Sequence, residues 1–184
     1  MRIYTRKGDD GTTGLYFGGR VPKQSPLVDA YGTVDEAQAF LGLARAEATK
    51  GSETDELLVG LERDLWVLMA DLATAKENRE KLEPGATAVT PSMVAALEAR
   101  IDEINAQFDM PKEFVVPGQN RLAALLDVAR TVVRRAERRA LAVSSEASQV
   151  VPYLNRLSDL LWTMARWQEG GSRPTDSAHE KELH

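Results

Sequence analysis

Apolar residues recur every three or four positions in five long stretches of the chain, the spacing of one face of an α-helix. Pro26 and Pro91 each open one of these stretches, where proline fits the first helical turn, and Thr90 is a candidate N-cap. The connections are short, which predicts an all-α, up-and-down five-helix bundle. The expected helices cover residues 27–49, 53–81, 91–108, 120–144 and 148–169.

Both ends of the chain lack this periodicity. Residues 1–26 are rich in glycine, threonine and charge, which predicts a loop with a short extended piece at 15–17. Residues 170–184 are polar and predict a disordered tail. We therefore expect a single helical domain over residues 1–169, which includes the N-terminal loop, followed by this tail.

Composition narrows the function classes. The 184 residues, 43% hydrophobic and 28% charged, fit one soluble domain with a sizeable core. The net charge of -5 argues against bulk binding to nucleic acid or to an anionic membrane. The N-terminus has no apolar signal core, and no apolar run approaches the roughly 20 residues of a membrane helix. These features favour a cytoplasmic protein.

The scarcity of reactive side chains excludes several kinds of catalysis. The sequence has no cysteine, which excludes disulfides, thiolate nucleophiles and cysteine-bound zinc. Its two histidines, His179 and His184, both lie in the polar tail. This position argues against a His-based triad, a His general base in the body and a Glu-x-x-His di-iron bundle.

The N-terminal loop has the composition of a phosphate-binding loop. Its glycines allow tight turns that bring backbone N–H groups close to a ligand, and its basic and hydroxyl side chains suit an anion. No Gly-Lys-Ser/Thr runs into a helix, so this is not a Walker A loop. A flexible polar arm is the alternative. The residues concerned are Thr5, Arg6, Lys7, Gly8, Gly11, Thr12, Thr13, Gly14 and Lys23.

The fourth expected helix carries five arginines within residues 130–139, with Glu137 as the one acid among them. Arg130, Arg134 and Arg138 are spaced four apart, so they lie along one side of the helix. Guanidinium groups this close repel one another, which predicts a counter-anion such as a phosphate chain. The alternative is a solvated face paired with glutamates of neighbouring helices.

Three further segments suggest a site. Gly32 lies inside the first expected helix and could mark a close approach, with Asp35 one turn later as a candidate partner for an arginine or a plain surface acid. Phe114 lies in the loop before the arginine helix, where it is a core plug or a pocket wall. Asn155 interrupts the apolar pattern of the fifth helix and either pairs with a neighbour or faces a site.

Taken in order, these segments resemble the PduO-type ATP:cob(I)alamin adenosyltransferases, also called corrinoid adenosyltransferases. The resemblance covers about residues 3–168, and six motifs follow one another at compatible spacing. It implies a ferritin-like helical bundle that forms a homotrimer with active sites between subunits. The motifs are Tyr4–Thr13, Gly19–Lys23, Ala30–Glu36, Phe114–Gly118, Ala129–Arg138 and Tyr153–Asp159.

The resemblance also assigns roles to individual residues. Phe114 would lie against the lower face of the corrin and displace the lower axial ligand, and Asp35 would pair with Arg134. Mg²⁺ would be bound through the ATP phosphates, with no protein ligand assigned. The residues implied to contact ATP or its Mg²⁺ are Thr5, Arg6, Lys7, Gly8, Thr12, Thr13, Lys23, Arg134, Glu137, Arg138 and Asn155, with Arg130 as a further site residue.

The implied activity transfers the 5′-deoxyadenosyl group of ATP to cob(I)alamin, or to a cob(I)yrinic acid a,c-diamide precursor, and releases triphosphate. Cobalt is the nucleophile, which suits a body without cysteine or histidine. A cob(II)alamin reductase and an adenosylcobalamin-dependent acceptor enzyme are the implied partners. The alternatives are a non-catalytic ATP- or cobalamin-binding carrier or sensor, and a helical RNA-binding or scaffolding module, which the net acidity disfavours.

The sequence departs from the family pattern at two places. Gln119 and Asn120 replace the usual small residues after Pro117-Gly118, which could alter the corrin pocket. Asp127 stands where histidine is common in the family and removes a polar or cobalt-proximal group. Neither change touches the residues assigned above.

Overall fold

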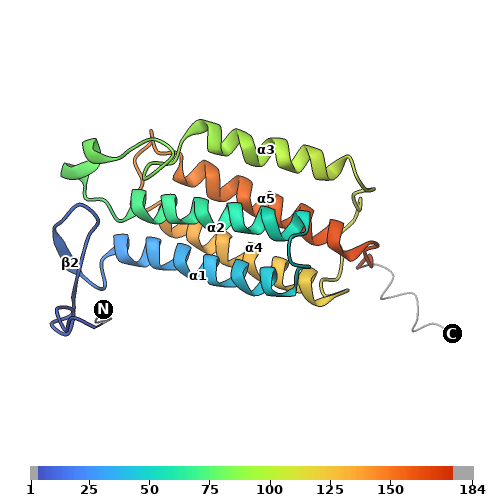
Figure 1. The fold of residues 1–184 in the computed structure, drawn as a ribbon, viewed down its shortest axis with the longest axis horizontal. Coiled ribbons are helices and arrows are strands. Elements are labelled where there is room, and N and C mark those ends of the chain that lie inside the picture. Colours follow the sequence, from blue (N-terminus) through green and yellow to red (C-terminus); the bar gives the residue numbers. More distant parts are fainter. Residues whose placement is uncertain (1–3, 176–184) are drawn as a thin grey trace.

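The computed structural model describes residues 4–175, and within that range five α-helices run alternately up and down (Figure 1). The predicted all-α, up-and-down five-helix bundle is confirmed. The helices are α1 (Pro26–Glu47), α2 (Glu53–Leu72), α3 (Pro91–Asn105), α4 (Arg121–Ala140) and α5 (Val150–Glu169), with a 3-10 helix, η1 (Lys76–Lys81), after α2.

Helix α4 lies at the centre of the packing. It contacts α1 along one side and α5 along the other, α2 packs on α1, and α3 packs chiefly on α5. The shared interior is aliphatic: Val34, Leu65, Leu126 and Leu157 are all fully buried. Burial of these side chains stabilises the bundle and fixes which side of α4 faces solvent. No helix within residues 4–175 is long and apolar enough to cross a membrane.

Side-chain caps fix where the helices begin. The hydroxyls of Ser25, Ser52 and Thr90 each accept a hydrogen bond from a backbone N–H of the first turn of α1, α2 and α3. Asn120 does the same for α4, where its Oδ1 lies 2.9 Å from the N of Ala123. The predicted start at Pro26 and the predicted cap at Thr90 are confirmed.

The predicted second helix, 53–81, is too long: α2 ends at Leu72. The Ala73 carbonyl accepts a hydrogen bond from the N of Tyr16 at 3.0 Å, and Ala75 is extended. Residues 76–81 are all polar and none is buried, so no apolar face holds them in an α-helix, and they form η1 instead. The predicted third, fourth and fifth helices are each longer than the observed ones by a few residues, a normal error at frayed ends.

The N-terminal loop is a small hairpin. Strands β1 (Thr12–Gly14) and β2 (Arg20–Pro22) pair antiparallel, with Thr13 opposite Val21. The predicted extended piece at 15–17 is instead the start of the turn that joins the strands, which uses positive φ angles at Phe17, Gly18 and Gly19. The bond from Tyr16 to Ala73 ties this hairpin to the end of α2.

The chain after α5 returns to the loop that precedes α4. The N of Val116 donates to the Arg173 carbonyl at 2.9 Å, and the N of Thr175 donates to the Phe114 carbonyl at 2.9 Å. The first residues of the expected tail, 170–175, are therefore attached to the loop that carries Phe114. The rest of that tail, including His179 and His184, lies outside the described residues.

Candidate functional site

The five arginines within residues 130–139 of α4 fall into three groups. Arg135 forms an ion pair with Glu36 of α1, and Arg139 forms one with Asp29 at 3.0 Å. These two therefore follow the alternative of a salt-bridged helix face. Arg130 is half-buried and pairs with Asp127, 3.1 Å from Nε to Oδ1.

Arg134 and Arg138 form the third group. Both are exposed, and neither has a carboxylate partner within residues 4–175. Arg138 instead donates from Nη1 to the Arg134 carbonyl at 3.0 Å. Two neighbouring guanidinium groups without a counter-ion repel each other, which favours an external anion on this face.

A hollow of about 530 Å³ adjoins Arg138, and the N-terminal loop supplies its opposite wall. Lys23 lies in this hollow directly after β2, and its N donates to the Gly11 carbonyl at 2.9 Å. A Cβ added at Gly8 would lie 3.3 Å from the Lys23 Nζ and 3.3 Å from the Thr12 carbonyl oxygen, so glycine lets the loop close on Lys23. The hollow is lined by Lys23, Gln24, Pro26, Val28, Asp29, Arg138, Arg139 and Ala142.

The hairpin itself is held by polar contacts. Arg20 donates to the Thr12 hydroxyl, with Nη2 at 2.6 Å, and Thr12 donates its hydroxyl to Asp10 at 2.8 Å. The hydrogen bond from the Thr12 backbone N–H, and then that from its hydroxyl, lower the pKa of the Asp10 carboxyl. Sequence reasoning missed the role of Arg20, although it is a basic residue inside one of the quoted motifs.

The other residues implied for the N-terminal loop lie near this hairpin. Thr5, Arg6 and Lys7 are exposed, and Thr13 is half-buried in β1. The Thr5 hydroxyl accepts a bond from the Lys7 N at 3.4 Å, and the Arg6 guanidinium lies 5.7 Å from the centre of the Tyr4 ring. Within residues 4–175 none of the first three lines the hollow beside Arg138.

Glu137 and Asn155 join α4 to α5. Asn155 donates from Nδ2 to the Glu137 Oε1 at 3.0 Å, and both side chains are half-buried. The structure thus brings these two predicted site residues together. Glu137 directly precedes Arg138 in α4.

Asp35 and Arg134 do not meet within one chain. Both are exposed, and no ion pair of Asp35 occurs among residues 4–175. A Cβ added at Gly32 would meet nothing within 4 Å, so no helix of the described chain approaches it closely.

Phe114 lies in the loop whose last residues line a second hollow, at the other half of α4. Its side chain is 82% exposed, and the residues after it, Pro117 and Gly118, line a hollow of about 350 Å³ with Asp127, Arg130 and Thr131. Arg130 and Arg138 are eight residues apart, or about 12 Å along the helix axis. The α4 surface therefore carries two separate hollows as candidate half-sites: a basic one at Lys23 and Arg138, and one at Arg130 and the end of the Phe114 loop.

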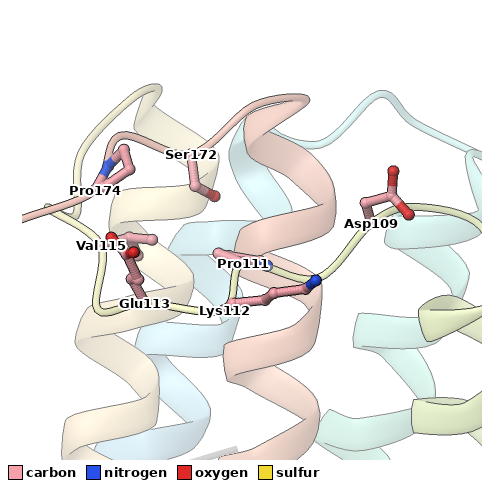
Figure 2. Close-up of a pocket in the computed structure, with 7 residues that line it drawn as sticks. All are labelled: Asp109, Pro111, Lys112, Glu113, Val115, Ser172 and Pro174. Carbon is pink, nitrogen blue, oxygen red and sulfur yellow. The ribbon is translucent and has the colours of Figure 1, made fainter.

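A third hollow, of about 400 Å³, lies behind the Phe114 loop. Figure 2 shows Asp109, Lys112 and Val115 on the loop side and Ser172 and Pro174 on the returning C-terminal segment. No residue predicted for the site lines it.

The departures from the family pattern have structural roles. Asn120 caps α4, and its Nδ2 donates to the Gln168 carbonyl at 2.8 Å, while the Gln119 Nε2 donates to the Gly171 carbonyl at 3.4 Å. Asp127 pairs with Arg130 and with Arg166, which is buried and which sequence reasoning missed. The signal was an arginine among the apolar positions of the fifth helix.

Comparison with known proteins identifies the family. The profile of a family described as cobalamin adenosyltransferase matches residues 3–168. The chain is 42% identical over 174 residues to a corrinoid adenosyltransferase of Citrobacter freundii, covering 91% of this chain and 95% of the relative. It is 39% identical over 187 residues to one of Bacillus subtilis, covering 98% and 93%.

A solved structure has the same fold. It is a variant PduO-type ATP:corrinoid adenosyltransferase from Lactobacillus reuteri, complexed with cobalamin and ATP. The TM-score is 0.83 at 28% sequence identity, and the match covers 94% of this chain and 98% of that one.

Proposed function

Because the chain belongs to the cobalamin adenosyltransferase family, we propose that it transfers the 5′-deoxyadenosyl group of ATP to the cobalt of cob(I)alamin or of a cob(I)yrinic acid a,c-diamide. The products are the adenosylated corrinoid and triphosphate. The chain acts as one domain over residues 1–169, in the cytoplasm.

One observation carries the proposal: Arg134 and Arg138 are exposed and lack carboxylate partners within the described chain, while Lys23 faces Arg138 across a hollow. The arginines beside them, Arg135 and Arg139, are neutralised by α1. The free cations are thus confined to one face and meet the glycine-containing loop. A triphosphate supplies the missing negative charge.

The reaction needs charge stabilisation more than proton transfer. The electron pair of Co(I) forms the Co–C bond to the 5′ carbon, and the C–O bond breaks so that triphosphate leaves with its electron pair. Arg134, Arg138 and Lys23 stabilise the charge of the leaving group, and no general acid is required. Mg²⁺ is bound through the ATP phosphates, and the Glu137–Asn155 pair holds this turn of α4 against α5.

Phe114 supports the corrin side of the reaction. An apolar ring in the lower axial position favours four-coordinate Co(II), which is easier to reduce to Co(I) than the five-coordinate form. The ring is free to meet a ligand, because it is 82% exposed. Burying such a ring under a flat macrocycle removes a large apolar area from water.

The working unit is a homotrimer with sites between subunits. Three features of the single chain support this: the two half-sites are about 12 Å apart along α4, Phe114 is uncovered, and Asp35 and Arg134 are exposed without each other. An ion pair between Asp35 of one subunit and Arg134 of the next would satisfy both. A cob(II)alamin reductase supplies the reduced substrate, and an adenosylcobalamin-dependent enzyme accepts the product.

The test is an anaerobic assay with cob(I)alamin and MgATP, in which the absorbance change to adenosylcobalamin is followed. We expect turnover, and we expect Arg134→Ala to raise the KM for ATP while the matched variant Arg135→Ala leaves it nearly unchanged. Folded protein that binds ATP without turnover would show a carrier or sensor instead. An unchanged KM in Arg134→Ala would remove that residue from the triphosphate site.

A further inference from the structure

One arginine lies entirely inside the bundle. Arg166, on α5, is only 1% exposed. A buried guanidinium is strongly unfavourable unless charged partners surround it. Its environment is therefore built for it, and the function described above does not use it.

The hydrogen bonds that Arg166 donates all come from one nitrogen, Nη2. Its Nη2 donates to Asp127 Oδ2 at 2.6 Å and to Glu169 Oε1 at 2.9 Å. The guanidinium lies 4.3 Å from the centre of the Trp162 ring, a cation–π distance. Its Nε and Nη1 are buried without a hydrogen-bond partner within the described chain, so Nη2 carries the polar contacts.

The first branch of this network leads to the hollow that Pro117 and Gly118 line, at the end of the Phe114 loop. Asp127 Oδ1 accepts a hydrogen bond from Arg130 Nε at 3.1 Å, while its other oxygen is held by Arg166. The Arg130 guanidinium lies 5.5 Å from the centre of the same Trp162 ring. Asp127 and Arg130 both line this hollow, so Arg166 fixes the carboxylate that fixes Arg130.

The second branch leads to the Phe114 loop itself. Glu169 Oε2 accepts a hydrogen bond from the Ser172 hydroxyl at 2.7 Å. Ser172 begins the returning segment seen in Figure 2, whose later residues exchange backbone hydrogen bonds with Phe114 and Val116. The same buried arginine thus anchors the segment that supports the loop.

We propose that Arg166 is a positioning residue of the corrin half-site, acting through Asp127 on Arg130 and through Glu169 and Ser172 on the Phe114 loop. This inference rests on the proposed function for its kinetic consequence. Arg166 touches no substrate: it sets the direction of one side chain and the position of one loop, and small displacements of such groups reduce rates strongly.

The first test compares Arg166→Met with Arg166→Lys. Met fills the space but leaves Glu169 without its cation and Asp127 with Arg130 alone, whereas one lysine ammonium can bind both carboxylates, as Nη2 does now. In Arg166→Met we expect kcat/KM for the corrinoid to fall by about tenfold or more, with the KM for ATP within about twofold of wild type. Arg166→Lys should recover most of the rate. Arg100→Met removes an exposed, ion-paired arginine of α3 as the matched control.

The second test separates the branches by hydrogen exchange of the backbone amides of Val116 and Thr175. Ser172→Ala breaks the loop branch, so we expect both amides to exchange faster than in wild type. Asp127→Asn alters the Arg130 branch, so it should lower the corrinoid kcat/KM with these amides unchanged. Both variants keep Arg166, so they still test the proposal if Arg166→Met does not fold.

The outcomes distinguish the two proposals. If wild type does not adenosylate corrinoids but the amides respond as expected, the proposed function fails and the network stands. If wild type turns over while Arg166→Met matches Arg100→Met in kinetics and in exchange, the positioning role is overturned. Equal loss in Arg166→Met and Arg166→Lys, with the KM for ATP raised in parallel, would also overturn it.

Discussion

Phe114 has the highest exposed fraction among the large hydrophobic side chains of residues 4–175. A ring that protrudes into water contributes no packing to the fold, so its removal should leave the bundle intact. We predict that Phe114→Ala keeps ATP affinity nearly unchanged but slows adenosylation strongly, because the lower face of the corrin is no longer covered. Stopped assays at several ATP concentrations test this.

The matched control for this variant is Trp66→Ala, which removes another exposed aromatic, on α2. It should retain wild-type kinetics. If Phe114→Ala lost ATP binding and rate in equal measure, the ring would belong to the nucleotide side of the site.

The buried Tyr153 pairs with the half-buried Asp64 of α2. The Tyr153 hydroxyl donates to Asp64 Oδ2 at 2.7 Å. Burial raises the pKa of the Asp64 carboxyl, and the hydrogen bond from Tyr153 opposes that rise. Burial also raises the pKa of the Tyr153 phenol well above its ordinary value.

We predict that Tyr153→Phe lowers the free energy of unfolding by about 1 kcal/mol near neutral pH. The loss should shrink as pH falls through the raised pKa of Asp64, because the protonated carboxyl no longer needs the donor. Urea unfolding between acid and neutral pH measures this. Tyr31→Phe, whose hydroxyl makes no hydrogen bond within the described chain, should show no such dependence, and a pH-independent loss in Tyr153→Phe would contradict the explanation.

Single residues show where sequence reasoning stops. Arg134 and Arg138 could be chosen from spacing alone, because residues four apart on a helix share a face. Arg166 could not, because its burial depends on Asp127 and Trp162, whose contacts arise only when α4 and α5 pack. Asp127 appeared as a departure from a pattern, and only the fold shows that it is a partner.

At the scale of elements, the segment after α2 depends on one buried carboxylate. Asp71 is 3% exposed; its Oδ1 accepts from Arg79 Nη2 at 2.7 Å and its Oδ2 accepts from the Val89 N at 3.0 Å. It thereby joins the end of α2 to η1 and to the chain entering α3. No local propensity does this, because the residues of η1 are polar throughout.

We predict that Asp71→Ala lowers the free energy of unfolding by about 2–4 kcal/mol, because a buried N–H and a guanidinium lose their acceptor. Denaturant unfolding followed by circular dichroism tests this. Asp102→Ala, at an exposed position on α3, is the control and should change stability little. A small effect at Asp71 would mean that the segment is held by its apolar contacts instead.

The five helices themselves were predictable, because each buries an apolar stripe whose period is visible in the sequence. Their ends were less so. Caps such as Thr90 and the proline at residue 26 mark helix starts chemically. The end of α2, in contrast, lies where the Ala73 carbonyl accepts a hydrogen bond from the Tyr16 N of the N-terminal hairpin. Sequence reasoning has no access to such a contact.

At the scale of the whole molecule, the two half-sites give a test of assembly. If Lys23 and Arg138 of one subunit serve the Phe114 side of the next, two inactive variants should complement each other. We predict that co-expression of Arg138→Ala with Phe114→Ala restores about one quarter of wild-type activity in randomly mixed trimers, since that fraction of interfaces combines two intact halves.

The control places both substitutions in one chain and mixes it with nothing, which should give no recovery. A site contained in a single chain would also give none in the mixture. Light scattering of the co-expressed protein checks that trimers have formed.

Neither the sequence pattern nor the fold of one chain shows a trimer. The family resemblance implies the trimer. The single chain adds only that Phe114 is exposed and that the charges of Asp35 and Arg134 do not pair with each other. A neighbouring subunit would cover these groups in a trimer, and the complementation experiment tests this.

The position of α3 predicts a partial opening of the bundle. Because α3 packs chiefly on α5, it can detach without disturbing the α1–α4 contact that holds the basic half-site. Its amides should then exchange with solvent through a partial opening, while those of α4 exchange only when the whole bundle unfolds. A spectroscopic label on the exposed side of α3 would therefore report this opening while the basic half-site stays intact.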